Sequence, residues 1–157
     1  MSYFALADCN NFYVSCERVF NPVLEKQAII ILSNNDGCII SRSNEAKALG
    51  IPMGAPVFKY RDLIRRGQIK CFSSNYALYG DMSQRVMDSL RRLCPDMEVY
   101  SIDEAFLKLD HFSYYDLTTY LMDIRQKIKQ WTGIPISIGL APSKTLAKVA
   151  NFYAKRV

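Results

Sequence analysis

The sequence predicts an α+β fold in which helices lie on one face of a mainly antiparallel sheet. Three observations carry this prediction. The chain opens with an apolar strand and a helix, and after residue 75 it runs through helix, strand, strand, helix, strand and helix. The stretch between about 21 and 75 consists of short pieces with several Gly and Pro residues. That order is typical of helices layered on an antiparallel sheet, with a small inserted subdomain.

The first half of the chain predicts one buried strand and several short elements. Tyr3 to Ala7 is an apolar run typical of a central strand. Asn10 and Asn11 can cap a helix that ends before Pro22. The expected elements of the insertion are strands over 28–32 and 38–41 and helices over 43–49 and 61–66.

The second half predicts longer elements. Apolar residues recur at helical spacing in two helices, at Met82, Val86, Leu90 and Leu93 and at Leu117, Leu121, Ile124, Ile128 and Trp131. Ser113 is the expected cap of the second helix. Residues 98–109 predict two strands around a tight connection at Asp103-Glu104, 134–140 predicts a strand, and Ser143 opens the last helix.

Composition excludes several classes of protein. The 157 residues are 50% hydrophobic and 22% charged, which suits one packed core and argues against disorder. No apolar run approaches the roughly 20 residues that span a bilayer, so we expect no membrane partner and a cytoplasmic location. The five cysteines are odd in number and form no C-x-x-C pair, which argues against a disulfide framework or a zinc site.

Three carboxylates are the strongest candidates for chemistry. Asp8 ends the apolar opening strand, and Asp103 and Glu104 lie side by side between two apolar segments. Each has an ordinary alternative, a helix cap for Asp8 and a polar turn for the acidic pair. If the strand ends are adjacent, the three carboxylates meet at one edge of the sheet. Such a set of hard oxygen ligands predicts a site for two Mg²⁺ ions.

The last helix predicts a cationic ridge. Lys144, Lys148 and Lys155 fall within about 40° of one another on a helix, and Asn151 joins their stripe. The opposite face, expected to point toward the core, carries Leu146, Val149 and Tyr153. No acidic residue accompanies the lysines after Ser143, so phosphate binding is a better interpretation than helix ion pairs.

Six stretches together resemble one family. They are residues 8–17 (DCNNFYVSCE), 32–38 (LSNNDGC), 44–47 (NEAK), 71–76 (CFSSNY), 100–106 (YSIDEAF) and 139–148 (GLAPSKTLAK). In this order they are similar to the Y-family (translesion) DNA polymerases, closest to the UmuC-type catalytic subunit of bacterial DNA polymerase V. The resemblance covers nearly the whole chain.

The resemblance implies a fold and an activity. Residues 1–20 and 76–157 would form a ferredoxin-like palm and 21–75 the fingers, while the thumb and little finger would be absent. The activity would be template-directed transfer of a nucleotide from a dNTP to a primer 3′-hydroxyl, in DNA damage tolerance and the SOS response. The isolated palm and fingers would be weakly active or inactive.

The resemblance also assigns site residues. Asp8 and Asp103 would bind two Mg²⁺ ions, which Mn²⁺ can replace, with Glu104 and the backbone carbonyl of Cys9 completing the site. Tyr13, beside Phe12, matches the steric gate that excludes a ribose 2′-hydroxyl. The expected phosphate contacts are Asn44, Lys47 and Lys155 for the incoming triphosphate, and Lys144 and Lys148 for DNA or nucleotide phosphates. Many relatives carry Tyr and Arg where this chain has Asn44 and Lys47.

The implied partners are primer–template DNA, a dNTP and, in the full-length protein, a UmuD-type accessory subunit and a recombinase filament. Two alternatives stay open at this point. The chain can be a non-catalytic module that binds DNA or a polymerase subunit, or another palm-type enzyme such as a nucleotide cyclase. A preference for ATP or GTP over the deoxynucleotides would favour the cyclase.

Overall fold

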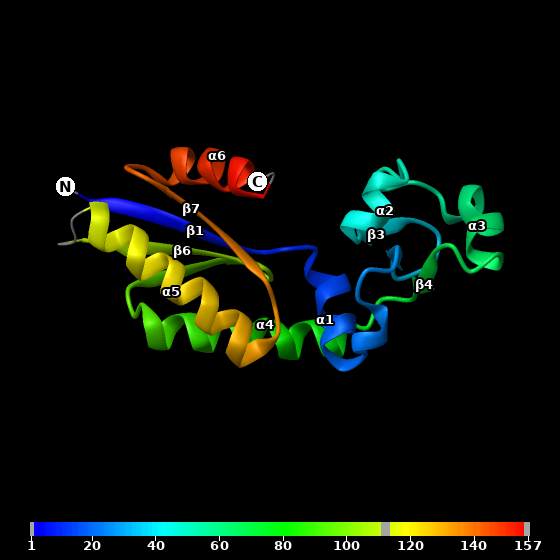
Figure 1. Cartoon of the computed structure of the whole chain (residues 1–157), viewed down its shortest axis with the longest axis horizontal. Helices are drawn as coiled ribbons and strands as arrows, with labels where there is room; N and C mark the ends of the chain where they lie inside the picture. Colours follow the sequence, from blue (N-terminus) through cyan, green and yellow to red (C-terminus); the bar gives the residue numbers. More distant parts are fainter. Residues whose placement is uncertain (1, 111–113, 156–157) are drawn as a thin grey trace. The chain divides into compact units, whose positions relative to one another are not determined.

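A computed structural model describes residues 2–110 and 114–155 of the chain. Figure 1 traces the order of helices and strands along the sequence. The chain divides into two compact units, one formed by Met1–Asn10 and Gly80–Val157 and the other by Asn11–Tyr79. The second unit is larger than the expected insertion of residues 21–75, because it also includes the helix that follows the opening strand.

The first unit is built on a four-stranded sheet in the order β5-β6-β1-β7. Its strands are β1 (Tyr3–Cys9), β5 (Met97–Ser101), β6 (Glu104–Leu109) and β7 (Ile136–Ala141). Every neighbouring pair is antiparallel, as the sequence predicts. β1 lies between β6 and β7 and is buried from Ala5 to Cys9, which explains its continuous apolar sequence.

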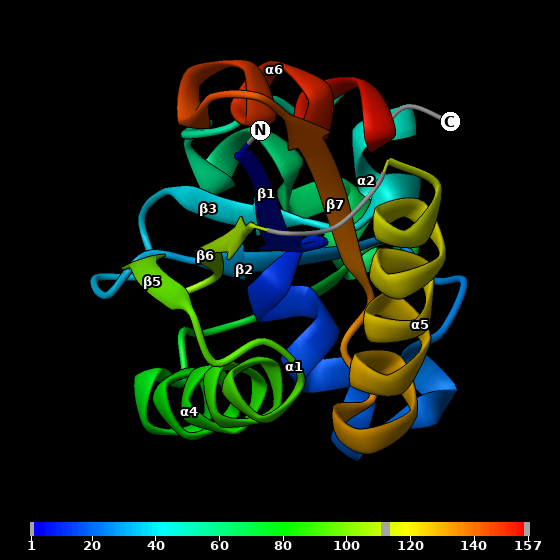
Figure 2. The ribbon, with the colours of Figure 1, turned by 90° about the vertical axis from the view of Figure 1, so that its left-hand side faces the viewer.

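Three helices cover this sheet, and they lie on both of its faces. They are α4 (Tyr76–Leu93), α5 (Tyr114–Thr132) and α6 (Lys144–Ala154). Figure 2 shows α4 and α5 on one face and α6 on the other. The expected arrangement on one face therefore holds for α4 and α5, which are joined by a hydrogen bond from the Tyr120 hydroxyl to the Leu93 carbonyl.

The predicted core stripe of α5 is correct except at its end. Leu117, Leu121, Ile124 and Ile128 are buried, but Trp131 is 49% exposed. Thr132 takes the inward position, four residues after Ile128, and its hydroxyl donates to the Ile128 carbonyl. The predicted cap residue Ser113 lies outside the described residues.

The predicted orientation of α6 is wrong. The face expected to be buried is exposed, at Leu146, Val149 and Tyr153. Ala147 and Asn151 are buried instead, so Asn151 does not belong to an exposed cationic stripe. The reason is Gly139 of β7: a Cβ there would lie 2.1 Å from the Asn151 backbone nitrogen and 2.5 Å from the Ala147 carbonyl oxygen. The backbone of α6 rests directly on the sheet, and only small or hydrogen-bonding side chains fit beneath it.

The second unit has a three-stranded sheet in the order β3-β2-β4. Its strands are β2 (Ile29–Leu32), β3 (Ile39–Arg42) and β4 (Lys70–Phe72), with β3 antiparallel and β4 parallel to β2. Its helices are α1 (Phe12–Phe20), α2 (Asn44–Ala48) and α3 (Arg61–Arg65), with short 3₁₀ turns η1 (Pro22–Leu24) and η2 (Val57–Tyr60). The predicted strands and helices of this region are confirmed within one or two residues.

Helix capping follows the sequence only in part. Ser143 accepts a hydrogen bond from the Leu146 backbone N–H and caps α6, as predicted. Asn11 stands at the cap position of α1, but it has a left-handed backbone and its side chain makes no capping bond. Asn10 does not cap α1 either, since its side-chain oxygen accepts from the Ser137 hydroxyl.

Two exclusions drawn from the sequence can be compared with the structure. All five cysteines are free, and three of them are buried, although Cys38 is exposed. Within the described ranges, no helix combines the length and the apolar character needed to cross a bilayer.

Candidate active site

The acidic ends of two neighbouring strands lie side by side. Asp8, near the end of β1, pairs directly with Glu104 at the start of β6 and with Ser137 of β7 on its other side. Residues directly opposite each other in an antiparallel pair place their side chains on the same face. Asp8 and Glu104 are therefore neighbours on one face of the sheet, as the sequence predicts.

Asp103 is held next to this pair by its backbone and its side chain. The predicted tight connection is Ile102–Asp103, and Glu104 already belongs to β6. The Asp103 carbonyl accepts a hydrogen bond of 2.9 Å from the Cys9 N–H, which fixes the connection to the end of β1. Ser101 Oγ lies 3.0 Å from both Asp103 Oδ1 and Glu104 Oε1, so its one proton can be donated to either carboxylate.

Lys155, which immediately follows α6, supplies the cation that faces Asp8. Its Nζ donates to Asp8 Oδ2 at 2.5 Å. Asn151, one turn earlier, donates to the Leu6 and Ser137 carbonyls at 3.1 and 2.9 Å and ties the helix to β1 and β7. Sequence reasoning identified Lys155 but missed Ser101 and the docking role of Asn151. The pairing of small residues in α6 with Gly139 is the signal that could have indicated the latter.

Burial makes the carboxyl groups of Asp8 and Asp103 weaker acids than usual. The pKa of Asp8 is raised to about 6, mainly by burial, with a smaller contribution from the negative charges of Asp103 and Glu104 and with the Lys155 ammonium opposing the shift. The pKa of Asp103 is also raised, mainly by burial. Three crowded carboxylates of this kind are stabilised by added positive charge.

The chemical type of these oxygen ligands suits a hard divalent cation. Carboxylate oxygens with a nearby backbone carbonyl are the ligands that Mg²⁺ and Mn²⁺ prefer. As the side chains lie in this structure, however, no three His, Cys, Asp or Glu residues of the described ranges are close enough to share one ion. Binding would require the Asp8, Asp103 and Glu104 side chains to turn toward one another, with Asp8 sharing or leaving its contact to Lys155.

The raised pKa of Asp8 predicts a pH-dependent stability. Because its folded-state pKa of about 6 lies above the unfolded value of 3.8, the folded protein binds more protons between pH 4 and 6. The free energy of unfolding should therefore fall as the pH rises through this window. Asp8→Asn should remove up to about 3 kcal/mol of that fall. Urea unfolding of the wild type and of Asp8→Asn at pH 4 and pH 7 measures this fall in each protein. An equal fall in both would contradict the raised pKa of Asp8.

The lysines at the start of α6 have partners on β5. Lys144 pairs with Glu98 at 2.6 Å, and its ammonium lies 5.4 Å from the centre of the Phe106 ring. Lys148 Nζ donates to the Tyr100 hydroxyl at 2.9 Å, which raises the pKa of Lys148, and lies over the Tyr100 ring. The sequence shows no acid within the helix, yet Glu98 neutralises Lys144 from another strand. Both lysines remain exposed.

The expected sugar-selecting residue belongs to an aromatic cluster of the second unit. The ring of Tyr13 stacks on Tyr79 with centroids 4.3 Å apart and an interplanar angle of 12°. Tyr76 meets both rings edge-on. Tyr79 is fully buried and its hydroxyl donates to Glu17, so it is a fixed support for Tyr13. Phe12 is buried beside Tyr13.

Asn44 and Lys47, on the short helix α2, are exposed and converge on Asn11. Lys47 Nζ donates to Asn11 Oδ1 at 2.6 Å, and Asn11 Nδ2 donates to Asn44 Oδ1 at 3.0 Å. Sequence analysis treated Asn11 as a helix cap and missed this link.

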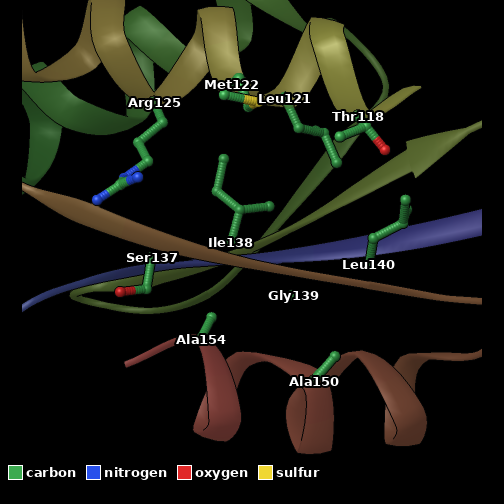
Figure 3. Close-up of a pocket in the computed structure, with 10 residues that line it drawn as sticks. All are labelled: Thr118, Leu121, Met122, Arg125, Ser137, Ile138, Gly139, Leu140, Ala150 and Ala154. Carbon is green, nitrogen blue, oxygen red and sulfur yellow. The ribbon is translucent and has the colours of Figure 1, made fainter. Parts of the chain in front are cut away.

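A cavity of about 430 Å³ lies beside the edge strand β7, between α5 and α6. Figure 3 shows Leu121 and Arg125 on the α5 side, Ile138 on β7 and Ala150 on α6. Arg125 Nε donates to the Ile136 carbonyl at 3.2 Å and covers part of that edge. The carboxylates do not line this cavity.

Comparison with known proteins identifies the family. The family model described as impB/mucB/samB matches residues 7–151. Protein ImpB of Salmonella typhimurium is 51% identical, and Protein UmuC of S. typhimurium is 50% identical, each over 98% of this chain and 36% of its own length. DNA polymerase IV of Desulfatibacillum aliphaticivorans is 32% identical over 94% of the chain and 38% of its own length.

Solved structures have the same fold. A crystal structure of DinB from Sulfolobus solfataricus superposes with a TM-score of 0.87 at 25% identity, covering 96% of this chain and 45% of that one. An insertion ternary complex of Dbh DNA polymerase superposes with a TM-score of 0.88 at 24% identity, covering 96% of this chain and 46% of that one. The fold is therefore that of the palm and fingers of a Y-family polymerase. The chain belongs to the impB/mucB/samB family and spans about a third of the length of its curated relatives.

Proposed function

We propose that the chain is the catalytic core of a translesion DNA polymerase. It transfers a nucleotide from a dNTP to the 3′-hydroxyl of a primer, under the direction of a template. Residues 1–20 and 76–157 act as the palm, and residues 21–75 act as the fingers.

The observation that supports this proposal most strongly is the meeting of three carboxylates at one edge of the sheet. Asp8 and Glu104 are cross-strand neighbours, and Asp103 is fixed beside them through Cys9 and Ser101. A purely structural role for three crowded acids is costly, because burial of each charge is unfavourable without a compensating cation.

Asp8, Asp103, Glu104 and the Cys9 carbonyl would hold two Mg²⁺ ions, which lower the pKa of the attacking hydroxyl and stabilise the leaving pyrophosphate. Ser101 keeps the Asp103 and Glu104 carboxylates oriented. Lys155 balances the charge of Asp8 and serves as a phosphate contact of the incoming nucleotide.

The remaining polar residues bind substrate. Tyr13, supported by Tyr79, packs against the deoxyribose and excludes a 2′-hydroxyl, with Phe12 as its neighbour. Asn44 and Lys47 contact the triphosphate. Lys144 and Lys148 exchange Glu98 and Tyr100 for phosphates of the DNA, because both pairs are exposed and weakly held.

The biological setting is also part of this proposal. The chain acts in the cytoplasm during DNA damage tolerance, and in its full-length form it works with a UmuD-type subunit and a recombinase filament. Support comes from the 50% identity to Protein UmuC of S. typhimurium.

Calorimetric titration of the chain with nucleotides tests the proposal. With Mg²⁺, we expect a dNTP to bind at least about tenfold more tightly than the matching ribonucleotide, because the buried Tyr79 holds Tyr13 in place against the sugar. Chelation of the metal should weaken binding by a similar factor. Tighter binding of ATP or GTP would favour a nucleotide cyclase, and DNA binding without nucleotide binding would favour a non-catalytic module.

A further inference from the structure

The exposed indole of Trp131 lines a cavity that the proposed active site does not use. The cavity has a volume of about 280 Å³ and lies between α4 and α5, which cover the same face of the sheet (Figure 2). Its lining residues are Arg85, Asp88, Ser89, Arg92, Trp131 and Thr132, and none of the proposed metal ligands is among them. Because Thr132 takes the inward position at the end of α5, the Trp131 side chain is left at the surface, beside the arginines of α4.

The surroundings of Trp131 decide what its exposure indicates, since a single exposed aromatic side chain is common in proteins. Within residues 2–110 and 114–155, the indole has no aromatic, cation–π or hydrogen-bonding partner. It therefore offers a planar apolar surface on which another planar group can stack.

The charges around the indole favour an anionic ligand. Arg85 and Arg92 line the cavity together with one carboxylate, that of Asp88. Asp88 already accepts a hydrogen bond of 2.8 Å from Gln84 and lies 3.5 Å from the Arg91 guanidinium. Arg92, by contrast, has no ion pair or hydrogen bond in the part of the chain that the structure describes. An organic cation would meet two guanidinium groups here, so the ligand that fits is both planar and anionic.

The spacing of the two arginines favours a strand over a single nucleotide. Arg85 and Arg92 are seven residues apart on α4, which places them on one face of the helix and about 10 Å apart along its axis. Arg85 uses its Nε for Asp81, at 3.0 Å, so its terminal nitrogens remain as donors. A nucleoside monophosphate has one phosphate, whereas a strand offers successive phosphates to both guanidinium groups while a base stacks on Trp131.

We propose that this cavity is a binding site for single-stranded nucleic acid. A base of the strand stacks on the Trp131 indole, and Arg92 and Arg85 contact its phosphates. The site lies on the helical face of the first unit and needs neither a metal ion nor the carboxylates at the end of the sheet. The inference therefore goes beyond the proposed function and does not depend on it.

Tryptophan fluorescence tests the stacking directly, because Trp131 is the only tryptophan of the chain. We expect a short oligothymidylate, added with a chelator to remove metal, to quench this fluorescence as it binds. An abasic strand of the same length and charge should bind about tenfold more weakly and leave the fluorescence unchanged. Equal binding of both strands, without quenching, would show that only phosphates are recognised and would overturn the inference.

Variants separate the two kinds of contact when binding is followed by the anisotropy of a labelled strand. Trp131→Leu keeps an apolar side chain without the planar ring and should weaken binding about tenfold, whereas Trp131→Phe should recover part of that loss. Arg92→Gln should reduce the slope of log affinity against log salt by about 0.7, because one phosphate contact is lost. Arg65→Gln is the matched control, since it is the same change at an exposed residue of α3, and it should leave binding within about twofold.

The remaining outcomes distinguish this inference from its alternatives. Unchanged affinity in both Trp131 variants would contradict it. Equally tight binding of an oligoglutamate, with the same dependence on Arg92, would assign the cavity to an acidic protein segment instead. Quenching by thymidine monophosphate at the same affinity would make it a pocket for free nucleotides. Quenching by the strand in a chain that binds no dNTP would leave this inference standing while the proposed function fails.

Discussion

Replacing Asp103 by asparagine is expected to abolish nucleotidyl transfer while the fold is retained. The change keeps the side-chain size and the Cys9–Asp103 backbone bond, which needs no side chain. It removes one charge from the proposed metal ligands, whose contribution to the transition state is several kcal/mol. We expect a loss on the order of a thousandfold in primer extension. The assay uses S. typhimurium Protein UmuC with its 154 matching residues replaced by this chain.

The same variant should be more stable than the wild type at neutral pH. Burial and the charge of Glu104 raise the pKa of Asp103, so its ionised form is disfavoured in the folded state. Asparagine removes that cost. Asp81→Asn is the control, because Asp81 is an exposed partner of Arg85 on α4 and should change neither property. Full activity in Asp103→Asn would refute the assignment of a catalytic carboxylate.

Replacing Gly139 by alanine is expected to lower the free energy of unfolding strongly. The new Cβ would stand 2.1, 2.5 and 2.7 Å from backbone atoms of Asn151, Ala147 and Ala150. Backbone atoms cannot rotate away, so α6 as a whole would have to move from β7. Overpacking typically costs about 1–3 kcal/mol and occasionally more, and contacts this short with backbone atoms predict a loss of about 3 kcal/mol. The displacement should also break the Asn151 bonds and the contact between Lys155 and Asp8.

Gly80→Ala provides the matched control for this prediction. Gly80 lies inside α4, and a Cβ there would meet no atom within 4 Å apart from the nearby backbone of its own helix. Alanine should stabilise this helix by about 0.5–1 kcal/mol. Urea unfolding measures both changes, and hydrogen exchange of the α6 amides follows the displacement. A Gly139→Ala protein with unchanged stability and exchange would show that α6 does not rest on β7 as described.

The positions of the three carboxylates could be predicted because their sequence context is local. Asp8 ends an apolar strand, and Asp103 and Glu104 interrupt two apolar segments, so each lies where a strand of the sheet ends. The antiparallel pairing of β1 with β6 then brings them together, whereas the sequence analysis had left the adjacency of these strand ends as a condition.

The orientation of α6 could not be read from its own periodicity. Leu146, Val149 and Tyr153 recur at helical spacing and therefore indicate a buried face, yet they are exposed. The buried face is set by Gly139, on another strand, which allows an unusually close approach of the helix backbone. The same holds for Lys144 and Lys148, whose partners Glu98 and Tyr100 lie more than forty residues away in the sequence. Long-range partners of this kind leave no local signal.

The helix start at Asn11 illustrates a different limit. An asparagine before a helix ordinarily caps it, and the sequence gives no sign that this side chain turns to α2 instead. The competing bond to Lys47 is charge-assisted, and such bonds are roughly twice as strong as neutral ones. The tertiary contact therefore prevails over the local capping preference.

A crystal of the chain soaked with Mn²⁺ and a dNTP tests the central claim most directly, because Mn²⁺ is located by its anomalous scattering. We predict metal bound jointly by the carboxylates of Asp8, Asp103 and Glu104, with the Lys155 ammonium moved from Asp8 toward the triphosphate. Metal that binds elsewhere, with the Lys155–Asp8 contact intact at saturating nucleotide, would contradict a catalytic role for these three residues.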